Sequence, residues 1–94
     1  MKWRLRITPK VQEALQSFPP QPKHYIREAF GEIAKDPWEG KPLRDELQGL
    51  HSFRAKRFRI IYQIQRENRL VFVVGLGPRE TIYEELTKEL RSKP

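Results

Sequence analysis

Residues 53–62 read FRAKRFRIIY, and this stretch decides the fold because it contains two short strand patterns separated by two residues. Apolar and basic side chains alternate on either side of Lys56-Arg57, as in strands that bury one face. A two-residue hairpin turn at Lys56-Arg57 places Arg54 directly opposite Arg59. The other face then presents apolar side chains that would pack on helices, namely Phe53, Ala55, Phe58, Ile60, Tyr62 and Ile64. The stretch therefore predicts a hairpin with an apolar inner face and an arginine pair on the opposite face.

The arginine pair is unfavourable for the free protein, because like charges facing each other across a ladder cost a few tenths to about 1 kcal/mol. An anion bound between the two guanidiniums reverses this effect, since both can donate hydrogen bonds to one phosphate. Arg54 and Arg59 therefore predict a phosphate-binding surface. The alternative is that both arginines extend into water or pair with Asp45 and Glu46 from the preceding loop.

The amino-terminal third of the chain predicts one strand followed by two helices. Residues 3–7 alternate apolar side chains with arginines, the pattern of a half-buried strand. Thr8-Pro9 is a typical helix start, and the short helix after it should end at the prolines within residues 19–22. A second amphipathic helix ends at Asp36, just before a proline. We expect the two helices to form an antiparallel hairpin on the sheet.

The rest of the chain predicts a loop, three strands and a helix. Prolines and glycines make residues 37–50 a loop, and the glycines within residues 75–78 should end the last strand. The strands are expected at residues 52–55, 58–65 and 70–76, with a turn at Glu67-Asn68 between the last two. An apolar helical stripe follows, formed by Ile82, Tyr83, Leu86 and Leu90. The predicted fold class is α+β: a twisted antiparallel sheet of the first strand and three later strands, with a helical hairpin and a carboxyl-terminal helix.

Composition narrows the possible functions. The chain has 94 residues, which allow one domain over residues 1–94, and it has no cysteine. Disulfides, thiolate metal sites and a cysteine nucleophile are therefore excluded. No apolar run approaches the length of a membrane span, and the amino terminus does not resemble a signal peptide. A soluble cytoplasmic protein without a membrane partner is the default expectation.

The net charge of +7 is unevenly distributed. Residues 1–50 carry 9 basic and 7 acidic side chains, whereas residues 51–94 carry 10 basic and 5 acidic ones. Residues 51–66 alone contain five basic residues and no acidic one. A basic segment of this kind is typical of a surface that binds nucleic-acid phosphates, and the alternative is a solvated basic surface.

Other candidate groups surround this segment. Arg79 follows the predicted end of the last strand, and Tyr83 comes four residues later, which places both on one face if they share a helix. If Tyr83 lies near three cations, its phenol could act as a general base, because positive charges favour the deprotonated form. The alternative is that Tyr83 simply packs in the core. His24 and His51 have no partners at metal-ligand spacing, so zinc is not expected, although His51 stays an alternative acid or base.

Three motifs resemble the RelE/ParE toxin superfamily. They are Leu47-x-Gly49-Leu50-x-Ser52-Phe53-Arg54, which leads into the hairpin, Phe58-Arg59-Ile60-Ile61-Tyr62 within it, and Val74-Gly75-x-x-x-Arg79-x-x-x-Tyr83 after it. The central motif is fairly specific, the flanking ones are weak alone, and the element order extends the resemblance to nearly the whole chain. Many members carry Gly-Asp where this chain has Lys56-Arg57, and a positive φ there would cost a residue other than glycine about 1 kcal/mol. RelE-type sites also often contain more lysine on the second strand.

The resemblance implies a fold, partners and a reaction. Members have a twisted sheet backed by a helical hairpin, and an antitoxin protein neutralises them. RelE-like members cleave messenger RNA in the ribosomal A site, without a metal or cofactor, by attack of a 2′-hydroxyl on the adjacent phosphate. Matched by position, Arg59 would hold the scissile phosphate, Arg79 would stabilise the transition state or the leaving oxygen, and Tyr83 would orient or activate the 2′-hydroxyl. Arg54 matches a further basic position, and the other expected RNA-binding residues are Lys56, Arg57 and Arg66.

Two other functions fit the same sequence. A ParE-like toxin that inhibits DNA gyrase without catalysis would share the fold and the antitoxin but would not need Tyr83 or clustered arginines. A basic RNA-binding domain or an inactive relative of the toxins would keep the basic surface alone. Because one fold can carry any of these functions, only the geometry and chemistry of the site can distinguish them.

Overall fold

The structure is a computed structural model that describes residues 3–92, and it has the predicted α+β composition. Its helices are α1 (Pro9–Ser17), α2 (Pro20–Lys35) and α3 (Ile82–Ser92), with short 3-10 helices η1 (Pro37–Glu39) and η2 (Asp45–Leu47). Its strands are β1 (Arg4–Ile7), β2 (Lys41–Pro42), β3 (Leu50–Ala55), β4 (Phe58–Gln65) and β5 (Leu70–Pro78). No helix within residues 3–92 is both long enough and apolar enough to cross a bilayer.

The five strands form one sheet in the order β1-β5-β4-β3-β2. The pairs β3–β4 and β4–β5 are antiparallel as predicted, and β2, which the sequence did not predict, is antiparallel to β3. Strand β1 is parallel to β5, so the sheet is mixed and not antiparallel throughout. The alternation of side chains predicts which face of a strand is buried but not the direction of its neighbour. Parallel neighbours need a long connection between them. Here the connection consists of α1, α2 and the strands β2, β3 and β4, after which the chain returns beside β1 as β5.

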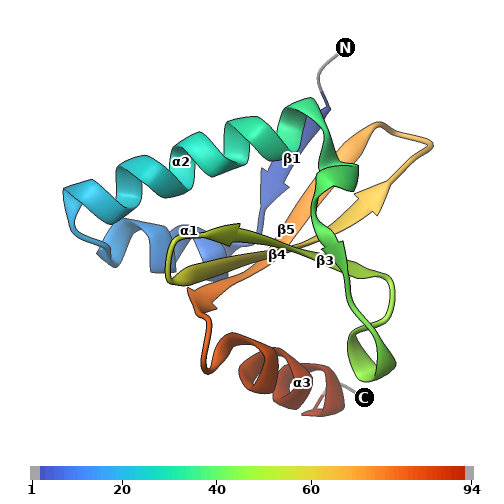
Figure 1. Cartoon of the computed structure of the whole chain (residues 1–94). Helices are drawn as coiled ribbons and strands as arrows, with labels where there is room; N and C mark the ends of the chain where they lie inside the picture. Colours follow the sequence, from blue (N-terminus) through green and yellow to red (C-terminus); the bar gives the residue numbers. More distant parts are fainter. Residues whose placement is uncertain (1–2, 93–94) are drawn as a thin grey trace.

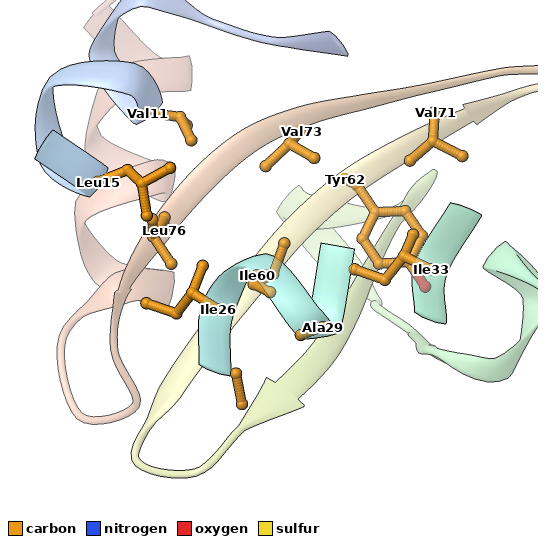
Figure 2. Packing of buried hydrophobic residues seen from close by; sticks show 11 residues of the cluster. Val11, Leu15, Ile26, Ala29, Ile33, Ile60, Tyr62, Val71, Val73 and Leu76 are labelled. Atoms are coloured by element: carbon orange, nitrogen blue, oxygen red, sulfur yellow. The ribbon is translucent and has the colours of Figure 1, made fainter. Parts of the chain in front are cut away.

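The sheet lies between two unequal helical layers (Figure 1). Helices α1 and α2 cover one face, as expected for the helical hairpin, and α3 lies on the other face. The main core contains Val11 and Leu15 of α1 together with Ile26, Ala29 and Ile33 of α2. In Figure 2 these side chains face Ile60, Tyr62, Val71, Val73 and Leu76 from the sheet. The helix start at Thr8 is confirmed, since its hydroxyl accepts a hydrogen bond from the Val11 amide at 3.2 Å.

The predicted β3–β4 hairpin is confirmed residue by residue. Arg54 pairs with Arg59 and Ala55 pairs with Phe58, which leaves Lys56 and Arg57 as the turn. Lys56 has a φ of 56°, a left-handed conformation that is unfavourable for lysine. Its ammonium lies 5.2 Å from the centre of the Tyr25 ring on α2, a cation–π contact worth about 0.5–1 kcal/mol at exposed sites. This contact offsets part of the backbone strain that the missing glycine leaves in the turn.

The prediction that the last strand ends at residue 76, within the glycine-containing residues 75–78, is wrong. Strand β5 continues to Pro78, with Gly75 opposite Ile61 and Gly77 opposite Arg59. The glycines leave space for α3, because a Cβ on Gly75 would lie 2.9 Å from a methyl carbon of Leu86. Small residues at these strand positions therefore let the helix approach the backbone closely.

Helix α3 begins at Ile82, which corrects a second expectation. Arg79 lies in the turn before the helix, so Arg79 and Tyr83 are not one helical turn apart on a shared face. Of the predicted apolar stripe, Ile82 and Leu86 are buried and Tyr83 is half-buried, but Leu90 is 45% exposed.

The predicted loop at residues 37–50 is fixed to the sheet and contains β2. The hydroxyl of Tyr62 donates a hydrogen bond to the Pro37 carbonyl oxygen at 2.7 Å, and burial raises the pKa of Tyr62 to about 12. A Cβ on Gly40 would lie 2.0 Å from that hydroxyl oxygen, so only glycine fits there. These contacts fix the backbone immediately before β2, which pairs with the outer edge of β3.

Candidate nucleic-acid interface

The centre of the candidate site is the pair Arg54 and Arg59, which face each other across β3 and β4. They lie on the same face of the sheet as α3, because the residues on either side of them point into the core under α1 and α2. Arg54 is exposed, and its Nε makes a long hydrogen bond of 3.4 Å to the Lys56 carbonyl oxygen. The Nε of Arg59 is shielded from solvent and has no hydrogen-bond partner among residues 3–92. A shielded guanidinium nitrogen without an acceptor is unfavourable in the free protein.

Internal carboxylates do not neutralise this pair. Glu46 instead forms a two-pronged ion pair with Arg91 of α3, with N–O distances of 2.6 and 2.5 Å. The hydrogen bonds from Arg91 hold the pKa of Glu46 below its usual value. Within residues 3–92, neither Arg54 nor Arg59 forms a salt bridge, and neither does Asp45. The alternative in which the loop carboxylates neutralise the arginines therefore does not hold.

Tyr83 reaches the same strand through Ser52. Its hydroxyl lies 2.8 Å from the hydroxyl of Ser52, a residue that is 4% exposed and stands two positions before Arg54 on β3. Side chains two residues apart on a strand lie on one face, so Tyr83 and the arginine pair share this surface. The ring of Tyr83 also packs against the small apolar cluster around Leu47 and Ile61, which means that Tyr83 combines core packing with a polar contact.

The sequence did not suggest a role for Ser52. The sequence does indicate that Ser52 lies on the same face of its strand as Arg54. It does not indicate that Tyr83, 31 residues later in the chain, lies beside Ser52.

Arg79 lies at the tip of the β3–β4 hairpin. Its amide donates a hydrogen bond to the carbonyl oxygen of Arg57 at 3.0 Å, and its side chain is exposed. Two residues earlier, Gly77 pairs with Arg59. The backbone of β5 therefore places Arg79 next to Arg57 and close to the arginine pair.

Two of the other predicted RNA-binding residues point elsewhere. Lys56 lies over Tyr25, toward α2, and Arg66 lies 5.3 Å from the centre of the Trp38 ring. Arg66 follows the last residue of β4, whereas Arg59 is near its beginning, so the structure does not bring Arg66 to the arginine pair.

The histidines do not belong to this surface. His51 lies between Trp38, whose ring centre is 5.7 Å away, and Tyr62, whose ring is stacked at 5.8 Å. Burial lowers the pKa of His51, and its Nδ1 has no hydrogen-bond partner in the described part of the chain. His24 is exposed beside Glu28. Residues 3–92 contain no group of three or more His, Cys, Asp or Glu side chains arranged to hold a metal ion.

A hollow of about 320 Å³ opens beside the arginine pair. Its lining includes Arg54, Arg59 and Ser52 from the hairpin, together with Glu39 and Lys41 from the anchored loop. The surface thus combines unneutralised guanidiniums, a phenol and a concave space, which suits a phosphodiester with an adjacent hydroxyl.

Comparison with known proteins identifies the family to which this chain belongs. Residues 5–83 match the family described as ParE toxin of type II toxin-antitoxin system, parDE. Toxin RelG of Mycobacterium tuberculosis is 34% identical over 85 residues, which cover 88% of this chain and 98% of RelG. Toxin RelE of the same organism is 30% identical over 83 residues, which cover 86% of each chain.

Among solved structures, the toxin-antitoxin complex RelBE2 from Mycobacterium tuberculosis contains a chain that superposes with a TM-score of 0.78 at 32% identity. The match covers 84% of this chain and all of that one. Since the family match spans most of the chain and relatives above 30% identity align over nearly their full length, the protein belongs to the RelE/ParE family of type II toxin-antitoxin toxins.

Proposed function

We propose that this protein is a toxin that inhibits translation by cleaving messenger RNA on the ribosome. The observation that carries the proposal is the pair Arg54 and Arg59: the two cations face each other, and within residues 3–92 neither forms a salt bridge with a carboxylate. A phosphate bound between them accepts hydrogen bonds from both guanidiniums and removes their mutual repulsion. The net charge of +7 adds a general attraction to ribosomal RNA.

The proposed reaction uses only RNA groups and protein side chains. The 2′-hydroxyl of one nucleotide loses its proton, and its oxygen bonds to the phosphorus of the following linkage. The bond from phosphorus to the 5′ oxygen breaks, and that oxygen takes up a proton. The products are a 2′,3′-cyclic phosphate and a 5′-hydroxyl end, so atoms and charge balance without an external reactant.

We assign each side chain a role that its place in the structure supports. Arg59 and Arg54 hold the scissile phosphate, whose negative charge grows as the 2′ oxygen attacks. Tyr83 accepts or donates a hydrogen bond at the 2′-hydroxyl and so orients it, with Ser52 holding the phenol in position. Arg79, at the end of β5, stabilises the charge that develops on the leaving oxygen or on the transition state.

We also propose a cognate antitoxin as the partner in the cell, because the RelBE2 relative was solved as a toxin-antitoxin complex. An apolar hollow of about 660 Å³ between α3 and the sheet supports this, since its lining includes Leu50, Phe72, Val74 and Leu90. Apolar surface of this kind on a small protein suits a protein partner.

The test is to add the purified full-length protein to ribosomes programmed with a defined message and to map the RNA ends. Wild type should cleave the message. Arg79→Ala should lower the cleavage rate about 10²–10³-fold, and Tyr83→Phe should lower it somewhat less. Neither substitution should unfold the protein. Arg27→Ala, an exposed arginine on α2, serves as the charge-matched control.

The match to a family of ParE toxins favours one further candidate. It is the function that the resemblance to ParE-like toxins implies, non-enzymatic inhibition of DNA gyrase. Supercoiling assays with the same variants separate the two. Intact messages together with inhibited gyrase, unchanged in the Arg79 and Tyr83 variants, would replace the nuclease proposal with this one.

A further inference from the structure

Lys41 is a basic residue next to the site that the sequence pattern did not single out. It is the first residue of the short edge strand β2 and pairs with Ser52 of β3. Paired residues in an antiparallel ladder present their side chains on the same face, with Cβ atoms about 4.5–5.5 Å apart. Lys41 therefore stands on the face where Ser52 contacts the Tyr83 hydroxyl and where Arg54 follows two residues later.

Two hollows meet at this lysine. The hollow of about 320 Å³ contains the arginine pair, and a second of about 660 Å³ is lined by Tyr83 and by loop residues that include Leu43 and Arg44. Among the residues that the structure describes, Lys41 is the one that lines both. The lysine thus lies on the border between the phosphate-binding arginines and the phenol.

The backbone that carries Lys41 is fixed, and its side chain is not. Gly40 packs against the Tyr62 hydroxyl with no room for a Cβ, and Pro42 restricts φ on the other side. The Lys41 side chain is exposed and forms no salt bridge within residues 3–92. Glu39 lines the arginine hollow as well, but it makes no ion pair with Lys41 or the arginines in the described part of the chain. An unpaired ammonium on a rigid strand is available to an anion.

We propose that Lys41 is a third cationic ligand of the scissile phosphate and stabilises it in the transition state. This inference rests on the proposed function. The 2′-hydroxyl and the phosphate that it attacks belong to one linkage, so a substrate that contacts both Tyr83 and Arg59 must place that phosphate between them. Lys41 occupies this border, and its charge contributes most when the phosphate gains negative charge during the attack.

The experiment measures single-turnover cleavage of a message on programmed ribosomes as a function of toxin concentration. The variants are Lys41→Met, which keeps the length but removes the charge, and Lys41→Arg, which restores a charge. Lys35→Met on α2, an exposed lysine away from this face, is the matched control. We expect Lys41→Met to lower the maximal rate about 10–100-fold, the range for a hydrogen bond to a charged group, with the half-saturating concentration changed less than about threefold. Lys41→Arg should recover most of the rate.

Each other result contradicts the inference in a recognisable way. If Lys41→Met cleaves at the wild-type maximal rate, or only raises the half-saturating concentration, the lysine does not act on the transition state, while the proposed function stands. If Lys41→Arg is as slow as Lys41→Met although both variants melt at the wild-type temperature, a role through charge is wrong. Absence of cleavage by wild type would remove the proposed function, and this inference with it.

Discussion

Replacing Arg54 by glutamine is expected to stabilise the free protein, although it weakens the proposed phosphate site. Arg54 is exposed and faces Arg59 across the β3–β4 ladder, and it forms no salt bridge within residues 3–92. Two charges roughly 7 Å apart in a medium of dielectric constant about 80 repel each other by ~0.6 kcal/mol, within the range for like charges across a ladder. The hydrogen bond that the variant loses, from Arg54 to the Lys56 carbonyl at 3.4 Å, is long and exposed and contributes little.

This gain corresponds to a melting temperature about 2–5 °C higher in low salt, since 1 kcal/mol shifts the midpoint of a chain this short by about 4–8 °C. Calorimetry or circular dichroism at about 20 mM and 500 mM salt measures it, because the higher salt screens exposed charges and should remove most of the difference. Inorganic phosphate should raise the melting temperature of wild type more than that of the variant, because the anion binds between two guanidiniums only in wild type.

Arg27→Gln on α2 controls for the loss of one positive charge from a basic protein. Two results would contradict this prediction: Arg54→Gln is no more stable than Arg27→Gln at low salt, or its gain is the same at both salt concentrations. Either result would mean that the paired arginines do not repel each other and that a bound phosphate relieves no repulsion.

Three further predictions concern the parts that hold this surface in place. Tyr62→Phe leaves the Pro37 carbonyl without its buried hydrogen bond, so the free energy of unfolding in urea should fall by about 1–3 kcal/mol; an unchanged value would show that the loop is not anchored there. Gly75→Ala places a methyl group 2.9 Å from Leu86, so the free energy of unfolding should fall by about 1–3 kcal/mol and α3 should become more sensitive to limited proteolysis. Protease resistance equal to that of wild type would contradict close docking of α3. Because burial lowers the pKa of His51, the unfolded chain binds its proton more readily, and stability should be full above about pH 6.5 and decrease as the pH falls below it. Melting temperatures between pH 7.5 and 5.5 should therefore fall more for wild type than for His51→Gln, and parallel curves would exclude His51 as the cause.

Much of this protein follows from local sequence patterns. The alternation on either side of Lys56-Arg57 allows one register for the hairpin, because a slip by one residue would turn the apolar face to water. That register alone placed Arg54 opposite Arg59. The helix start at Thr8 was equally predictable, because capping depends on a few consecutive residues.

Contacts between distant segments were decided only in the folded chain. The direction of β1 beside β5, the passage of β5 through Gly75 and the placement of Tyr83 against Ser52 all depend on how elements meet in space. Lys41 shows the same limit, since it reached the site through a two-residue strand that no periodicity could reveal. Sequence by itself determined which residues share a face within one element. The tertiary structure decided which faces meet, because that choice is made by burial and hydrogen bonding between segments with no local sequence signal.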